Sequence, residues 1–256
     1  MLKRQAYYPW LVIATTCVAA FIGQVDASIV QLALPDLERV FDAPLHAVSW
    51  VAIGYLLAFA CLLPVFARVA EIAGRKVMYL AGFAVFGLVS ALCALAPSLP
   101  ALIAFRVLHG AAGAMLGANS IAILVTAAGP DRKGRGMGIY AAAQAVGISV
   151  GPAVGGLLLD TFDWRWIFWV NVPFALAATA IGWLVLPRTA ETSADRRFDW
   201  PGALLLTPAL TLLLLAITQV RAWGPLSTAT LGCGAAALLL LAAFVLRERN
   251  LHSPLL

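Results

Sequence analysis

The sequence predicts an all-α integral membrane protein with eight membrane-spanning helices. Hydrophobic residues make up 62% of the 256 residues and charged residues 11%, whereas soluble domains run at about 45–50% and about 25%. A helix needs about 20 apolar residues to cross a bilayer, and this chain has enough apolar residues for eight such helices. The composition therefore excludes a soluble globular protein.

Apolar runs of spanning length follow one another along the whole chain, each bounded by charge, Pro or Gly. They lie at residues 10–34, 48–69, 77–95, 99–125, 137–159, 166–186, 201–219 and 227–246. The first run continues past residues 18–20 without a signal-peptidase site and contains Asp26. We therefore interpret it as an uncleaved span rather than a signal peptide.

The basic residues predict the orientation, because cytoplasmic loops carry an excess of Lys and Arg. With both termini in the cytoplasm, thirteen basic residues fall on the inner side, three on the outer side, and Arg106 inside a span. The inner set is Lys3, Arg4, Arg68, Arg75, Lys76, Arg132, Lys133, Arg135, Arg188, Arg196, Arg197, Arg247 and Arg249, and the outer set is Arg39, Arg165 and Arg221. The eight tryptophans lie near predicted span ends, where the indole ring prefers the headgroup region.

Several function classes are not expected. The net charge of +5 is spread over short groups between apolar runs, which argues against a nucleic-acid partner. The four cysteines have no Cys-x-x-Cys spacing, and no phosphate-binding loop is present, so disulfide, zinc and ATP-driven chemistry are not indicated. We expect no enzymatic activity and no cofactor.

The longest polar connection is the one candidate domain boundary. It separates an N-terminal six-helix unit, residues 1–187, from two further spans in residues 201–256, with a cytoplasmic linker at 188–200.

Two ionisable residues lie well inside predicted spans, Asp26 in the first and Arg106 in the fourth. Each costs about 2.5–3.5 kcal/mol at the centre of a membrane helix, so each is expected to have a partner or a function. They lie about 12 Å and about 10 Å from the predicted outer ends of their helices. The shared depth predicts an ion pair for which an incoming proton or a cationic substrate could compete. The alternative is a pair that only orients two helices.

His109 follows Arg106 by three residues and lies on nearly the same helix face. A histidine there could relay a proton near neutral pH. A hydrogen-bonded packing role is the more common one for a lone helix histidine.

The fifth span contains a glycine ladder at Gly147, Gly151 and Gly155, with Pro152 and Gly156 beside it. Small residues at four-residue spacing let another helix backbone approach closely. Proline removes one intrahelical hydrogen bond, so a kinked and tightly packed seam is predicted.

Between the second and third spans, residues 67–76 form a charged connection. Glu71 and Arg75 have i,i+4 spacing, Gly74 permits a tight reversal, and Lys76 adds a second base. A charged hairpin that obeys the positive-inside rule is the simplest interpretation.

Together these motifs resemble the major facilitator superfamily. Residues 67–76 resemble its cytoplasmic signature Gly-x-Leu-Ala-Asp-x-x-Gly-Arg-Lys/Arg, with Ala67 in place of Gly and Glu71 in place of Asp. Residues 106–113 resemble its proton-coupling motif, with His109 where Gln is common, and residues 147–156 resemble its antiporter signature. Residues 26–35, 163–173 and 198–202 are similar to segments of the fourteen-helix drug:proton antiporter branch.

The resemblance implies a six-helix bundle of two inverted three-helix repeats, followed by two additional transmembrane helices. It implies that a proton gradient drives export of a lipophilic small molecule, neutral or cationic, across the plasma membrane. The implied proton-coupling and substrate residues are Asp26, Arg106 and His109; the implied gating loop is Glu71, Gly74, Arg75 and Lys76; the implied antiporter seam is Gly147, Gly151, Pro152, Gly155 and Gly156.

The family also has a second six-helix half, and this chain ends where that half would begin. We therefore expect an N-terminal fragment that needs the missing half, or a second copy, to enclose a pathway. The alternative is a truncated, non-transporting membrane protein that acts as a scaffold or is an inert relic. Reading the gene past Leu256 would separate the two.

Overall fold

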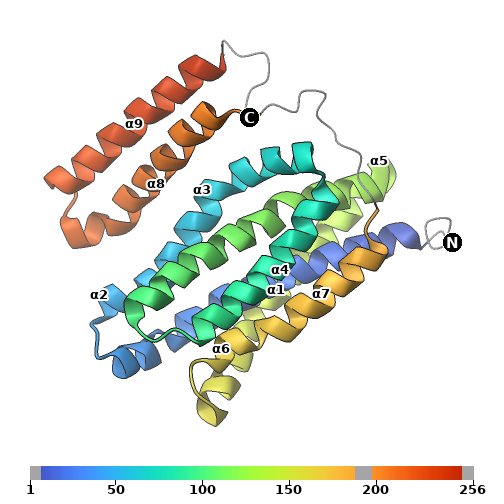
Figure 1. Cartoon of the computed structure of the whole chain (residues 1–256), viewed down its shortest axis with the longest axis horizontal. Helices are drawn as coiled ribbons and strands as arrows, with labels where there is room; N and C mark the ends of the chain where they lie inside the picture. Colours follow the sequence, from blue (N-terminus) through green and yellow to red (C-terminus); the bar gives the residue numbers. More distant parts are fainter. Residues whose placement is uncertain (1–6, 188–197, 250–256) are drawn as a thin grey trace.

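The computed structural model describes residues 7–187 and 198–249, and within these ranges the chain is helical with no strand (Figure 1). The helices are α1 (Tyr8–Phe41), α2 (Leu45–Val48), α3 (Trp50–Ala73), α4 (Arg75–Ala94), α5 (Leu99–Thr161), α6 (Trp166–Trp169), α7 (Asn171–Val185), α8 (Trp200–Trp223) and α9 (Thr228–Glu248). Most of the predicted linker at 188–200, and five of the predicted inner basic residues, lie outside the described residues.

Helix α5 consists of two antiparallel arms joined at Gly129. This glycine has φ 68° and ψ 177°, a conformation essentially restricted to glycine. After the bend, the second arm packs against the first. A Cβ atom on Gly136 would lie 3.2 Å from Cδ2 of Leu124, although residues twelve apart in a straight helix are separated by about 18 Å. Seven helices within the described residues are long and apolar enough to cross a membrane, and the 63 residues of α5, in two arms, are enough for two crossings. The eight predicted spans are all present.

The span boundaries differ from the prediction in two places. Helix α1 was expected to end near residue 34 but continues through Pro35 to Phe41, because a membrane bundle tolerates proline inside a helix. Residues 126–136 were expected to be a loop but are helical apart from Gly129, since this one residue makes the whole reversal.

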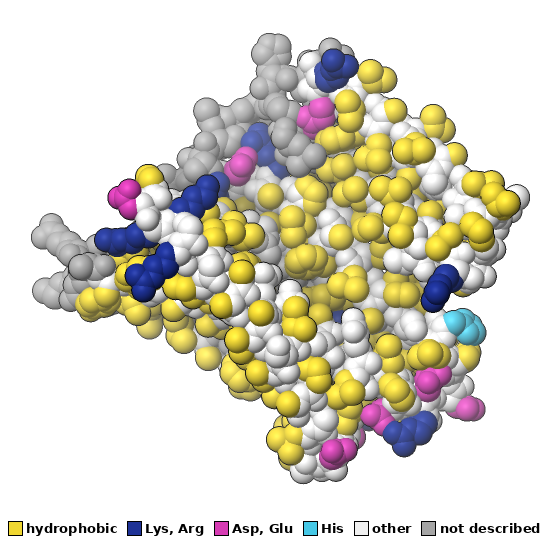
Figure 2. All heavy atoms as spheres, turned by 180° about the vertical axis from the view of Figure 1, so that it is seen from behind, with side chains coloured by type: hydrophobic (Ala, Val, Ile, Leu, Met, Phe, Trp, Pro, Cys, Tyr) yellow, Lys and Arg dark blue, Asp and Glu magenta, His cyan; other side chains and the backbone are white. Residues whose placement is uncertain are grey.

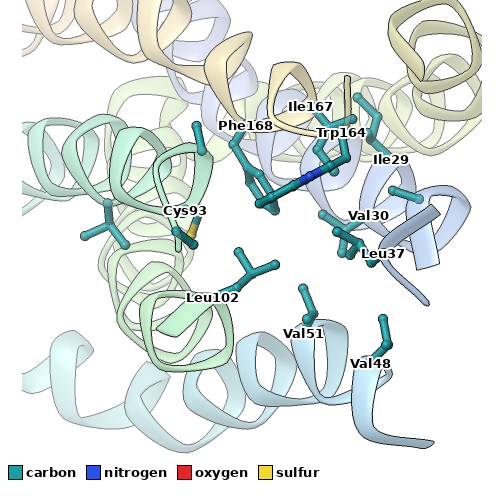
Figure 3. Packing of buried hydrophobic residues seen from close by; sticks show 14 of the residues in the cluster. Ile29, Val30, Leu37, Val48, Val51, Cys93, Leu102, Trp164, Ile167 and Phe168 are labelled. Carbon is teal, nitrogen blue, oxygen red and sulfur yellow. The ribbon is translucent and has the colours of Figure 1, made fainter. Parts of the chain in front are cut away.

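A hydrophobic cluster closes the end of the bundle where α1 ends and α6 lies, here called the Trp164 end (Figure 3). Trp164 was expected to face the headgroups but is 3% exposed. Its ring packs edge-on against Phe41, with 5.4 Å between centroids. Side chains from α1, α2, α3, α4, α5 and α6 meet there, and the cluster holds these six helices together at this end of the bundle.

Helices α8 and α9 pack against each other and reach the rest of the bundle mainly through α3 (Figure 1). Leu206 of α8 and Phe244 of α9 share a small cluster with Val65 of α3, and Thr211 Oγ1 lies 3.3 Å from Cys61 Sγ. The two helices form an addition to the side of a six-helix bundle.

On the face that Figure 2 shows, hydrophobic side chains are spread over the middle and charged side chains gather towards the margins. Eight described Lys and Arg residues fall at the end where α5 bends, here called the Gly129 end, and three fall at the Trp164 end. The charge asymmetry predicted from the sequence is therefore present along the bundle axis.

Candidate functional site

Asp26 and Arg106 form a buried ion pair in the middle of the bundle. Arg106 Nη1 donates to Asp26 Oδ2 over 2.8 Å, and the two side chains are 1% and 0% exposed. They come from α1 and the first arm of α5, 80 residues apart in the sequence. The contact that their shared depth predicted is confirmed, although α1 extends farther than expected.

The guanidinium of Arg106 is held on several sides. Nε donates to the backbone carbonyl of Val51 over 3.1 Å. The aromatic ring of Tyr55 lies 4.2 Å from Cζ and that of Phe168 5.7 Å. Cation–π contacts and a backbone acceptor replace the water that a buried guanidinium loses. Arg106 is therefore fixed in place independently of Asp26.

His109 completes the charged unit. Its Nδ1 lies 2.8 Å from Arg106 Nη1 and 3.8 Å from Asp26 Oδ2. Because a guanidinium only donates, Nδ1 accepts in this contact and the imidazole is neutral, with its proton on Nε2. Nε2 is buried and lies near the backbone of Phe86. A proton could reach Nδ1 only by displacing Arg106.

Asn171, the first residue of α7, is a member of the site that the sequence reasoning did not single out. Its Nδ2 donates to Asp26 Oδ1 over 2.8 Å and to Ser90 Oγ over 3.1 Å. Ser90 in turn donates to the backbone carbonyl of Phe168 over 3.1 Å. The available signal was that Asn171 is the one amide in the otherwise uncharged stretch 166–186. Both carboxylate oxygens of Asp26 are therefore hydrogen-bonded.

Close approach of α3 to α5 brings Tyr55 to this site. A Cβ atom on Gly110 would overlap the backbone carbonyl of Tyr55, and one on Gly113 would lie 2.9 Å from the Tyr55 hydroxyl. The sequence reasoning also left Tyr55 without a role, and the two glycines after Arg106 were the signal for it.

A pocket lies beside the charged unit, on the Gly129 side. It encloses about 580 Å³, part of it open to the outside, between α1, α3, α4 and both arms of α5. Its lining is apolar and aromatic with uncharged polar groups: Ala19, Ala20, Gly23, Gln24, Ala27, Tyr55, Leu56, Phe59, Phe86, Gly113, Leu116, Gly117, Ser120, Tyr140 and Gln144. Tyr55 and Phe86 also touch His109, with ring centroids 5.7 and 4.0 Å away. These two rings therefore contact both the pocket and the charged unit.

The loop at 67–76 forms a hairpin of helices in which the Glu71–Arg75 pair suggested by i,i+4 spacing does not form. Gly74 has φ 94°, which ends α3 and starts α4, so the two residues do not share a helix. Glu71 pairs with Arg68 over 2.8 Å. Arg75 Nη1 reaches Thr126 Oγ1 of α5 over 3.4 Å.

Lys76 crosses from α4 to the end of α7. Its Nζ donates to the carbonyls of Trp183 and Leu186, each over 2.7 Å. A cation at the C-terminal end of a helix also stabilises the helix dipole. The hairpin thus connects α3 and α4 to the Gly129 ends of α5 and α7.

The glycine ladder packs against α1 and flanks Asp26. A Cβ atom on Gly147 would lie 2.7 Å from the carbonyl of Phe21, and one on Gly155 would lie 3.3 Å from Ile29. Gly151, between them, faces Ser28 and Val25.

Two members of the predicted seam do not belong to this contact. Gly156 has no neighbour within 4 Å of a Cβ position, because it lies about 100° around the helix from Gly155. Pro152 is exposed, and helical φ/ψ angles continue through it. The bend predicted at Pro152 does not interrupt the helix, and the non-helical residue of α5 is Gly129.

Comparisons with known proteins place the chain in a family. The sequence profile of the Major Facilitator Superfamily matches residues 16–253. The chain is 33% identical to the tetracenomycin C resistance and export protein of Streptomyces glaucescens over 248 residues, which are 97% of this chain and 46% of that protein. It is 36% identical to the multidrug resistance protein B homolog of Mycobacterium tuberculosis over 215 residues, 84% of this chain and 40% of that protein. The chain thus spans less than half the length of these two relatives.

Solved structures agree on the fold. A bacterial homologue of the human lysosomal transporter Spinster, in an inward-facing and occupied conformation, gives a TM-score of 0.62 at 16% identity over 97% of this chain and 63% of that one. A transporter of the POT family gives 0.65 at 13% identity over 94% of this chain and 52% of that one. Helix order, buried site and sequence profile agree: the chain belongs to the major facilitator superfamily.

Proposed function

We propose that this chain is the N-terminal half of a proton-coupled secondary transporter that exports a lipophilic small molecule, neutral or cationic, from the cell. The relatives named for tetracenomycin C resistance and export and for multidrug resistance support an export role. A proton gradient, rather than a bound cofactor, is the proposed energy source. The proposed activity is transport, not catalysis.

The observation that carries the proposal is the sealed Asp26–Arg106 pair next to an apolar pocket. A carboxylate with no exposed surface is expensive in a membrane and usually marks an ion or proton pathway. A proton that binds Asp26 would remove its charge and weaken its hold on Arg106. The pair therefore has two states, with different helix contacts, that a proton gradient can drive.

The pocket supplies the second requirement of an exporter. It contains aromatic and aliphatic groups with the amides Gln24 and Gln144 and no charged side chain, which suits lipophilic ligands that are held by shape and a few polar contacts. Tyr55 contacts both Arg106 and the pocket. Its ring is the proposed route by which the ligand and the proton affect each other.

The remaining motif residues are proposed to act on the movement between states. The hairpin with Glu71, Gly74, Arg75 and Lys76 is the proposed gate at the inner end, because it joins α3 and α4 to α5 and α7. The contact of Gly147, Gly151 and Gly155 with α1 is the proposed seam, with exposed Pro152 and Gly156 outside it.

One bundle leaves the pocket open on one side, so the proposal requires a second half. That half is supplied either by the remainder of a longer chain or by a second copy of this one. The proposed location is the plasma membrane with both termini in the cytoplasm, as the eight-to-three distribution of described basic residues supports.

Ethidium efflux from whole cells tests the proposal. The complete gene product that contains this chain would be expressed in bacteria lacking their own drug exporters, and the cells loaded with ethidium. Energised cells should lose ethidium faster than cells with empty vector, and a protonophore should abolish the difference. Export that persists after the proton gradient collapses would contradict proton coupling. A protein that reaches the membrane but changes neither ethidium nor other cationic dyes would favour a non-transporting role.

A further inference from the structure

We propose that Asn171, oriented by Ser90, is a positioning residue that recognises the deprotonated form of Asp26 and sets the pH at which this carboxylate takes up a proton. The inference rests on the proposed function in that it takes Asp26 to be the proton site. It concerns the contact of α7 and α4 with that site, which the Asp26–Arg106 pair alone does not explain.

The orientation of the Asn171 amide follows from its neighbours. Ser90 Oγ uses its proton to donate to the Phe168 carbonyl, so towards Asn171 it can only accept. The amide must therefore turn its NH₂ group to Ser90, and the other hydrogen of that group points to Asp26 Oδ1. The Phe168 carbonyl thus fixes Ser90 as an acceptor, and Ser90 fixes Asn171 as a donor.

A fixed donor distinguishes the two protonation states of a carboxyl group. A carboxylate only accepts, and here both of its oxygens already receive a hydrogen bond, Oδ2 from Arg106 and Oδ1 from Asn171. Each oxygen keeps a further lone pair, so a proton need not displace a donor, but it removes the negative charge that strengthens both contacts. Uptake of a proton by Asp26 therefore weakens both hydrogen bonds.

Asn171 makes the weaker of the two contacts. Arg106 is a charged donor, which makes the stronger hydrogen bond, and it is held in place by Val51 and Tyr55. Asn171 is neutral and holds Asp26 through one hydrogen. Because Asn171 begins α7 and bonds to α4 through Ser90, the loss of this contact removes the hydrogen-bonded link from Asp26 to these two helices, while the link between Asp26 and α5 persists.

Other ionisable groups around Asp26 also affect its titration. The ionisable side chains that face it are Arg106 and His109 from α5, Tyr55 from α3 and Cys93 from α4, while α7 contributes the neutral amide of Asn171. None of these is changed by a substitution at Asn171 or Ser90.

Infrared titration of the chain in lipid nanodiscs tests the proposal without requiring transport. The C=O band of the protonated carboxyl group is followed against pH and assigned to Asp26 by its loss in Asp26→Asn. Asn171→Ala removes a donor that favours the anion, so the midpoint of the band should move to higher pH by about one unit or more. Ser90→Ala frees the amide to turn its oxygen towards a protonated carboxyl group, so the shift should have the same direction.

Two matched controls separate this role from general loss of buried polar groups. Asn119 is also a buried amide, but it donates to the Met115 carbonyl of its own helix. Thr16 is a buried hydroxyl that donates to the Ile13 carbonyl. Asn119→Ala and Thr16→Ala should leave the Asp26 midpoint where it is.

The outcomes distinguish this inference from the proposed function. An unchanged or lower midpoint in Asn171→Ala, or an equal shift in the controls, overturns the role of Asn171 and leaves Asp26 as the proton site. If no carboxyl band assigned to Asp26 titrates in the wild type, both the inference and the proton-coupled function are overturned.

Discussion

Gly151 of α5 and Ser28 of α1 are in direct contact, such that a Cβ atom on the glycine would overlap the Ser28 hydroxyl. Ser28 lies two residues after Asp26 and donates to the carbonyls of Gln24 and Val25. The glycine seam and the buried ion pair therefore meet on the same two turns of α1. Movement of the second arm of α5 along this seam would therefore displace the turn of α1 that carries Asp26.

The first prediction compares two glycines of the seam region. Gly151→Ala should destabilise the protein by about 1–3 kcal/mol, because its methyl group meets Ser28 and the Val25 carbonyl in a tightly packed contact. Gly156→Ala is the matched control on the same helix, with open space at its Cβ position. Alanine there should be neutral or stabilise by up to about 1 kcal/mol. Thermal unfolding in detergent, followed by size-exclusion of a fluorescent fusion, measures both.

Gly151→Leu should go further and abolish export by the complete gene product while membrane abundance stays near normal. A bulky apolar side chain widens a helix contact without placing a charge in lipid. Unchanged export in Gly151→Leu would show that the ladder is not a moving contact.

The second prediction concerns the energetic coupling of the ion pair. Asp26→Asn and Arg106→Gln should each destabilise strongly, by about 3–5 kcal/mol, because each leaves a buried polar partner uncompensated. The double substitution should cost much less than the sum of the two. A double-mutant cycle on unfolding midpoints in detergent measures the coupling.

The Arg68–Glu71 pair is the control for that cycle. Its N–O distance is also 2.8 Å, but Glu71 is 39% exposed, and pairs of this kind contribute about 0–1 kcal/mol. If the effects of the Asp26 and Arg106 substitutions on stability were additive, as expected for this surface pair, a functional link between the two buried charges would be refuted.

The third prediction isolates the backbone conformation of Gly129. A Cβ atom there meets nothing within 4 Å, yet φ is +68°. Gly129→Ala should therefore destabilise by about 1–3 kcal/mol through backbone strain alone. Gly134→Ala, also without near neighbours but at a helical φ, should not. Equal melting temperatures for the two variants would mean that the arms of α5 reverse without needing a positive φ.

The fourth prediction is the orientation in the membrane. A cysteine placed at Asp163, on the Trp164 end, should react with an impermeant maleimide in intact cells. One placed at Gly134, on the Gly129 end, should react only after permeabilisation. Three of the native cysteines are buried, and replacing Cys233 by Ser removes the remaining accessible thiol. The reverse labelling pattern would invert the proposed topology and with it the direction of export.

The sequence was sufficient for the fold class and for the Asp26–Arg106 contact. Both follow from the cost of polar groups in lipid. Apolar runs must form helices long enough to span the bilayer, and two opposite charges at the same depth are each stabilised by forming an ion pair. The glycine ladder similarly predicted a close contact, because glycine spacing reports directly on one helix face.

Partners that depend on the exact rotation of neighbouring helices were not predictable in this way. In the sequence, Asn171 resembles any polar residue near a span end. Only the rotation of α7 in the structure shows that its side chain bonds to Asp26. The i,i+4 spacing of Glu71 and Arg75 does not lead to a pair, because α3 ends at Gly74 between them. The number of residues in a span likewise does not reveal that α1 continues through Pro35.

Proton movement in everted membrane vesicles tests the central claim most directly. Vesicles containing the complete gene product are acidified by respiration, and ethidium is added while a pH-sensitive dye reports the interior. Ethidium should release protons from wild-type vesicles and from Asp36→Asn vesicles, since Asp36 pairs with Arg39 at the exposed end of α1. It should release none from Asp26→Asn vesicles with equal protein. Wild-type proton release in Asp26→Asn would contradict the assignment of Asp26 as the coupling carboxylate.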